Sequence, residues 1–192
     1  MTFTHKLAAI AVFSLCAGSS FALTNAEVRA EKDRIAVDYK AAKAQCKALK
    51  ANAKDICDKE AQGVEKVAKA DLEARFKPSD KTNYNVAVAK ADAVYEVAKE
   101  KCDDLSGNAK DVCVKDAKAA HVKGKEDAKV MKAILKPGET GAEKAAHVSE
   151  AKKDASAEKR EADYKAAKER CDALAGDAKT VCVNDAQRVY GQ

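Results

Sequence analysis

Apolar residues between positions 84 and 105 recur at alternating steps of four and three. They are Tyr84, Val88, Ala91, Tyr95, Ala98, Cys102 and Leu105. A second stretch, residues 28–49, keeps the same rhythm with Val28, Ile35, Tyr39, Ala42, Cys46 and Leu49. This spacing places the apolar residues on one narrow helix face, as in a coiled coil. Since no stretch alternates with the period of a strand, and Ala, Lys and Glu favour helix, the pattern predicts an all-α protein.

One string of residues occurs three times along the chain. Each copy has a tyrosine seven residues before a first cysteine and ten residues between that cysteine and a second one. The sets are Tyr39, Cys46 and Cys57; Tyr95, Cys102 and Cys113; Tyr164, Cys171 and Cys182. Self-similarity of this kind is typical of a tandem array built from one supersecondary unit.

Local signals place the ends of the helices. Thr24 with Glu27, and Thr140 with Glu143, form capping boxes that begin helices, and Pro78 and Pro137 end them. The predicted units are residues 23–78, 79–137 and 138–192. The apolar face almost disappears between residues 141 and 162, which predicts a solvated spacer helix that carries the third copy away from the second.

The chain is expected to reverse direction between each pair of cysteines. Gly107 and Gly176 suit a left-handed C-terminal cap of the first helix, and Asn108 and Asp177 suit the N-cap of the next helix. Each unit is then an antiparallel helical hairpin whose two cysteines face each other within disulfide reach. In the second copy, Leu105 and Val112 are expected to pack just inside the turn. The first copy fits this prediction least well, because Ala51 stands where the others have glycine.

An unbroken helix is the alternative to the hairpin. Eleven residues make three helical turns, so both cysteines would share one face about 16 Å apart. They could then bond only to another chain.

The N-terminus predicts export. Lys6, the apolar stretch 7–17 and the small residues Ser20 and Ala22 follow the order of a cleaved signal peptide covering residues 1–22. Its removal leaves six of the seven cysteines, an even number that predicts a disulfide framework in an exported, periplasmic protein. In the hairpin arrangement the bonds are Cys46–Cys57, Cys102–Cys113 and Cys171–Cys182. With no Trp and only four Phe, the core is too thin for compact packing of the whole chain, and an elongated array is expected.

The charge pattern bears on possible partners. The chain has 36 basic and 31 acidic residues, and loss of Lys6 with the signal leaves 35 against 31, or +4. Because the signs alternate along the helices, no basic stripe for nucleic acid is expected. No later stretch is apolar enough for stable membrane insertion. The expected partner is an envelope protein or polymer, with self-association as a further possibility.

The sequence offers no recognisable catalytic, cofactor or metal motif. The cysteine pairs are too far apart for a Cys-x-x-Cys redox site, and Cys102, Cys113 and His121 form an incomplete set of zinc ligands. His121 and His147 are isolated from any nucleophile motif, so the protein is expected not to be an enzyme. Tyr39, Tyr95 and Tyr164 lie on the apolar face, either as core residues or as a row of aromatic contacts for a partner.

The repeated string Tyr-x-x-Ala-Lys-x-x-Cys-x-x-Leu-x-Gly-[Asn/Asp]-Ala-Lys-x-Val-Cys resembles that of uncharacterised exported Ala/Lys-rich proteins of Gram-negative bacteria. Some of these are labelled by likeness to TolA, whose long periplasmic helix has a similar composition. TolA's membrane anchor and partner-binding domain have no counterpart here, so the resemblance implies an envelope protein without transferring TolA's functions. The leading hypothesis is a non-enzymatic structural or interaction protein of the cell envelope. The alternatives are a stress-protective hydrophilic helical protein and a metal-buffering protein.

Overall fold

A computed structural model describes residues 23–191, which form six α-helices, one short 3-10 helix and no strand. The helices are α1 (Asn25–Cys46), α2 (Ala51–Phe76), α3 (Asp80–Lys101), α4 (Gly107–Leu135), α5 (Gly141–Cys171) and α6 (Gly176–Tyr190), with η1 (Cys102–Asp104) following α3. The all-α prediction is therefore confirmed. The predicted signal peptide, residues 1–22, lies outside the described residues.

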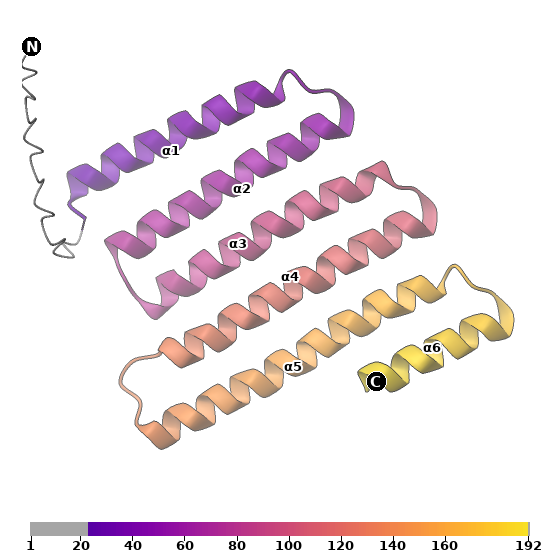
Figure 1. Cartoon of the computed structure of the whole chain (residues 1–192). Helices are drawn as coiled ribbons and strands as arrows, with labels where there is room; N and C mark the ends of the chain where they lie inside the picture. The colour runs from indigo at the N-terminus through magenta and orange to yellow at the C-terminus, as the bar shows by residue number, and fades with distance from the viewer. Residues whose placement is uncertain (1–22, 192) are drawn as a thin grey trace, which may run out of the picture.

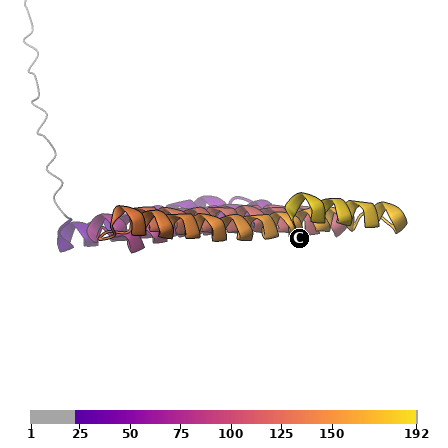
Figure 2. The same cartoon turned by 90° about the horizontal axis from the view of Figure 1, so that it is seen from below.

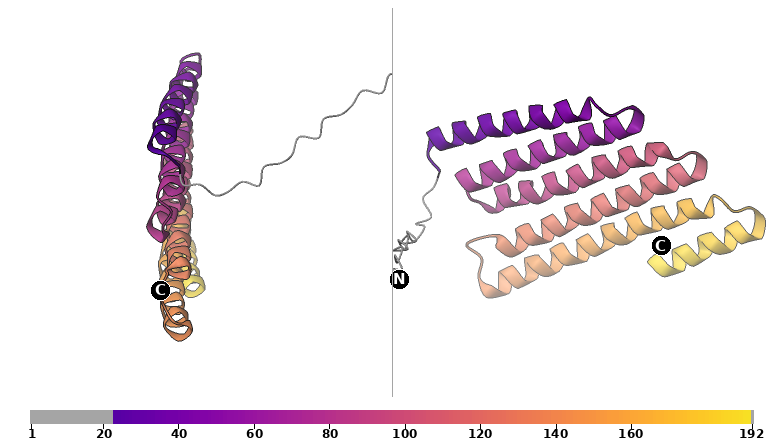
Figure 3. Two further views of the ribbon diagram at one scale, coloured as in Figure 1. Left: turned by 90° about the vertical axis from the view of Figure 1, so that its left-hand side faces the viewer. Right: turned by 45° about the horizontal axis from the view of Figure 1, so that its top comes forward.

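The helices lie side by side, each running opposite to its neighbour (Figure 1). Extensive packing occurs only between helices that are consecutive in the chain. Seen along its edge the array is a single flat layer (Figure 2), and the further views in Figure 3 agree. No second layer of described residues covers either broad face, so the expected elongated tandem array of hairpins is confirmed.

The buried residues lie in the contacts between neighbouring helices. Val28 and Ile35 of α1 and Leu72 of α2 form the one cluster of large buried side chains in residues 23–191, with Phe76 packed against it. Most other buried side chains are alanines. Because alanine buries little apolar area, each helix–helix contact contributes little hydrophobic stabilisation by itself.

The regular apolar face of α3 packs against its hairpin partner α4. Tyr95 of α3 stacks on His121 of α4 with ring centroids 4.5 Å apart. An added Cβ at Gly124 of α4 would lie 2.9 Å from the Cβ of Ala91. The spacing of these positions thus predicted the correct neighbouring helix.

The prediction of a spacer helix was wrong in one respect. Residues 141–162 are helical, but they belong to α5, which packs along α4 and does not carry the third copy away. Ala155 is fully buried, Lys123 pairs with Asp163 at 2.7 Å, and Lys159 pairs with Asp127. Small side chains let the two helices approach and charged ones bridge them, so large apolar residues are not needed here.

Side-chain caps are found at one end of the layer. The predicted capping boxes at Thr24 and Thr140 are present, and Ser79 with Thr82 forms a third that the sequence analysis missed. The helices that follow the turns between cysteines have no side-chain N-cap. Asn108 and Asp177 lie in the first turns of α4 and α6, so their assignment as N-caps was wrong. Gly107 and Gly176 are the first residues of these helices, so the prediction that they cap the ends of the preceding helices was wrong as well.

The chain reverses direction between every pair of cysteines, as predicted. The reversal uses one residue in the left-handed conformation in each copy, Ala51 with φ of 48° and Gly107 and Gly176 with φ of 56°. The expected packing of Leu105 inside the turn was wrong, because the chain leaves η1 in an extended conformation at this residue and the side chain stays 44% exposed. Leu49 and Leu174 are exposed to a similar extent at the other two turns.

Replacing Ala51 with glycine is expected to raise the free energy of unfolding by about 1 kcal/mol, because the left-handed conformation is unfavourable for a residue with a Cβ. Gly107→Ala and Gly176→Ala should lower it by a similar amount, since an added Cβ has open space at both sites and only the backbone is strained. Urea unfolding of the three oxidised variants measures these changes. A destabilised Ala51→Gly protein would contradict the left-handed turn.

Candidate functional site

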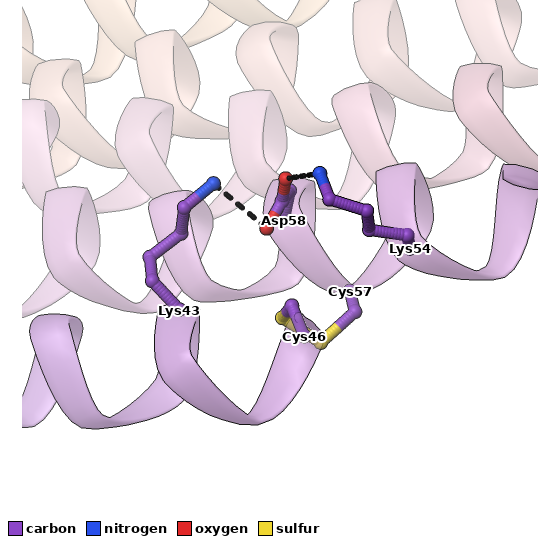
Figure 4. The surroundings of a disulfide bond; sticks show 5 residues. All are labelled: Lys43, Cys46, Lys54, Cys57 and Asp58. Atoms are coloured by element: carbon purple, nitrogen blue, oxygen red, sulfur yellow. Dashed lines mark hydrogen bonds and ion pairs between the residues drawn. A yellow bond between two sulfur atoms is a disulfide. The ribbon is translucent and has the colours of Figure 1, made fainter. Parts of the chain in front are cut away.

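Three disulfides join the two helices of each hairpin next to its turn. Their Cα–Cα distances are 5.5 Å for Cys46–Cys57, 5.6 Å for Cys102–Cys113 and 5.7 Å for Cys171–Cys182. Figure 4 shows the first of them, between the end of α1 and the start of α2. The first cysteine of each pair has no exposed surface. Since thiol exchange requires access to a sulfur atom, this burial is typical of structural bonds.

An Asp–Lys ion pair accompanies every disulfide. Lys110 lies 2.8 Å from Asp103, and Lys179 lies 2.7 Å from Asp172. In the first hairpin Lys47 occupies the position of these aspartates, and Asp58 instead pairs with Lys54 at 2.8 Å and with Lys43 of α1 at 2.7 Å (Figure 4). Hydrogen bonds from the lysines lower the pKa of all three aspartates. Each turn therefore has an ion pair across it in addition to the disulfide.

Glu31 of α1 links the first two helices at the opposite end of the layer. It accepts hydrogen bonds from Arg34 on its own helix at 2.7 Å and from Arg75 of α2 at 3.1 Å. These two guanidinium groups, Arg34 foremost, lower the pKa of Glu31 from 4.5 to about 2. Its carboxylate therefore stabilises the fold above pH 4.5, and this contribution is lost as the pH falls through about 2.

We expect Glu31→Gln to lower the free energy of unfolding at neutral pH. The difference from wild type should shrink below pH 4.5 and vanish only below about pH 2, where the Glu31 carboxyl is protonated and both side chains are neutral. Urea unfolding across this range measures the difference. Glu150→Gln, at an exposed carboxyl of α5 without an ion pair among the described residues, is the matched control and should show no such window. A constant difference for Glu31→Gln would contradict the assigned role of its charge.

The three repeated tyrosines occupy the first helix of each hairpin. Tyr39, Tyr95 and Tyr164 are all half-buried, so none is a fully enclosed core residue and none stands free in solvent. Tyr95 stacks on His121, and the ammonium group of Lys118 lies 5.6 Å from the centroid of the Tyr95 ring. The structure does not bring the tyrosines together, because each belongs to a different hairpin.

The two histidines lie in separate polar contacts. His121 bonds through Nε2 to Asp92 of α3 at 2.5 Å, and His147 bonds through Nδ1 to Glu139 at 2.7 Å. Within residues 23–191 no group of three or more His, Cys, Asp or Glu side chains is placed to hold a metal ion. Cys102 and Cys113, the other members of the considered zinc set, are joined in a disulfide.

Sequence reasoning missed an apolar groove between α2 and α3. The groove has a volume of about 650 Å³, and the two helices approach each other closely at the small residues Gly63 and Ala93. Val64 and Val94 line it and are 70% and 66% exposed. The signal in the sequence was a stripe of small and Val residues on each helix at steps of three and four.

Three further observations bear on the identity of the chain. None of the helices in residues 23–191 is both long enough and apolar enough to span a membrane. The disulfides indicate an oxidising, extracytoplasmic compartment. Comparisons with protein-family models, with curated proteins and with solved structures found no match.

Proposed function

We propose that the protein is a non-enzymatic component of the periplasm with a structural or protein-interaction role in the cell envelope. The observation that carries this proposal is the single layer of disulfide-bonded hairpins, which leaves two broad helical faces without a covering layer. Solenoid proteins that stack helices in series use such extended surfaces to bind other proteins. Crosslinked turns suit a surface that must keep its shape although its core is thin.

Export is the second part of the proposal. The signal-like order of residues 1–22 and the resemblance to exported Ala/Lys-rich proteins of Gram-negative bacteria support a periplasmic location. We expect the mature chain to begin at Leu23. N-terminal sequencing of protein recovered from a periplasmic fraction tests this, and an uncleaved chain retained in the cytoplasm would contradict it.

Binding to an envelope component is tested by crosslinking in intact cells. A photoreactive residue at Val37, which is 63% exposed on α1, should capture one discrete envelope component. The same residue at Val189 of α6, which is 66% exposed, shows whether capture depends on the position in the array. No crosslinked product from any exposed position would contradict the proposed interaction role.

Stress protection is the competing function, and the density of exposed charge favours it. A hydrophilic shield should keep its effect when exposed charges are shuffled among surface positions, whereas a specific binder should lose its partner. Protection of a heat-labile enzyme from aggregation, measured for the native and the shuffled chain, separates the two. For metal buffering, calorimetry of the oxidised protein with zinc or copper is the test, and micromolar binding would support it.

A further inference from the structure

The groove between α2 and α3 has an ordered arrangement on its α2 side. The residues of α2 that line it follow steps of three, one, three, one and three, so they form one stripe along the helix. In order they are Glu60, Gly63, Val64, Val67, Ala68 and Asp71. An acid thus stands at each end of an apolar centre.

The α3 side repeats this arrangement with the opposite charge. Its lining residues keep the same steps and the same order of charged, small, Val, Val, Ala and charged. They are Lys90, Ala93, Val94, Val97, Ala98 and Lys101. The groove therefore has an acidic rim on α2 and a basic rim on α3.

The four rim charges have no ion-pair partner among the described residues, although charged neighbours on the same helices do. Lys59 of α2 pairs with Glu96 of α3 at 3.4 Å, and Lys69 pairs with Glu65 at 2.6 Å. Val64 and Val94 stand beside the rims with most of their surfaces exposed. Apolar area and unpaired charge of both signs are thus gathered at one site.

We propose that this groove is the interface of a symmetric dimer, in which a second copy of the chain lies face to face with the first. The two-fold axis runs along the groove, parallel to the helices. This operation places α2 of each copy over α3 of the other, so that each acidic rim faces a basic rim. The four helices then alternate in direction and form an up–down–up–down bundle, whose interior is filled by the valines of both stripes.

The rim charges favour this axis over a two-fold axis that is parallel to the layer but perpendicular to the helices. An axis across the helices would place α2 on α2 and bring Glu60 of one copy near Asp71 of the other. Lys90 and Lys101 would meet in the same way. Like charges at such an interface oppose association.

Sedimentation velocity of the purified oxidised protein over a concentration series tests the proposal without any envelope component. Its outcome is therefore separate from that of the proposed function. We expect a reversible dimer for wild type. Glu60→Lys/Asp71→Lys and Lys90→Glu/Lys101→Glu should each raise the dimer dissociation constant at least about tenfold, because every rim contact becomes repulsive.

An equimolar mixture of the two charge-reversed proteins should dimerise as wild type does, since basic rims then face acidic ones. Lys152→Glu/Lys153→Glu, at exposed positions of α5, makes the same change in net charge as Lys90→Glu/Lys101→Glu and should leave the dimer intact. Circular dichroism checks that each variant is folded. A monomeric wild type, charge-reversed variants that dimerise like wild type, or a mixture that stays monomeric would overturn the proposal.

Discussion

Reduction of the three disulfides is expected to unfold most of the protein at room temperature. Each bond closes a loop between cysteines eleven positions apart, and such a loop stabilises the folded state by about 3 kcal/mol. Three independent bonds together contribute about 9 kcal/mol, which is comparable to the whole stability of many domains. The thin alanine core cannot replace this contribution. Urea unfolding followed by circular dichroism, with and without reductant, measures the loss.

Removal of one bond gives the matched control. Cys102→Ala/Cys113→Ala, in the middle hairpin, should lower the free energy of unfolding by about 3 kcal/mol and leave the other two bonds intact. Since both neighbouring hairpins pack against this one, we expect a single lowered transition and not a separate early one. If the fully reduced protein unfolded at the same urea concentration as the oxidised one, the bonds would not hold the array together.

Gly63→Val is expected to destabilise the protein by about 2 to 3 kcal/mol through overpacking between α2 and α3. An added Cβ at this position would lie 2.8 Å from the Cβ of Ala93 and 3.4 Å from its Cα, too close for the helices to keep their spacing. The larger side chain of valine would push α2 of the first hairpin away from α3 of the second. Urea unfolding of the oxidised variant measures the effect.

Exchanging the side chains of residues 63 and 93 tests whether crowding between them causes the loss of stability. In Gly63→Ala/Ala93→Gly the crowded Cβ of residue 93 is gone, and the gain and loss of helix propensity cancel. We expect this pair to be more stable than Gly63→Ala alone. Gly141→Ala is a control at a helical glycine with open space around it and should be neutral or slightly stabilising. A Gly63→Val protein as stable as wild type would refute close packing between α2 and α3.

The hairpins could be predicted from the sequence because each signal acts locally. Pro78 ends a helix whatever surrounds it, and Thr24 caps one through atoms three residues away. The equal spacing of the cysteines about a turn-forming residue fixed their pairing in the same way. Ala51 shows that the turn is imposed even without glycine, since the disulfide and the ion pairs of Asp58 hold the same geometry.

The packing of one hairpin on the next could not be predicted in this way. The contacts between α2 and α3 depend on Gly63 and Ala93 and on a bond from the Asn52 side chain to the carbonyl oxygen of Glu100. Those between α4 and α5 depend on alanines and on ion pairs such as that of Lys123 with Asp163. Small and charged residues occur on every face of these helices, so their pattern alone does not show which face has a neighbour. A prediction based on large apolar residues therefore found the hairpin partner of each helix and missed the second neighbour that α2, α3, α4 and α5 have.

Proteolysis of the non-reduced protein followed by mass spectrometry tests most directly whether the chain turns back between each pair of cysteines. The protein should be purified without reductant from the periplasm of a bacterial host. We predict three links within one chain, Cys46–Cys57, Cys102–Cys113 and Cys171–Cys182, and no free thiol in the mature protein. Links between separate molecules, or free cysteines at these six positions, would contradict the disulfide-bonded hairpin and the layer built from it.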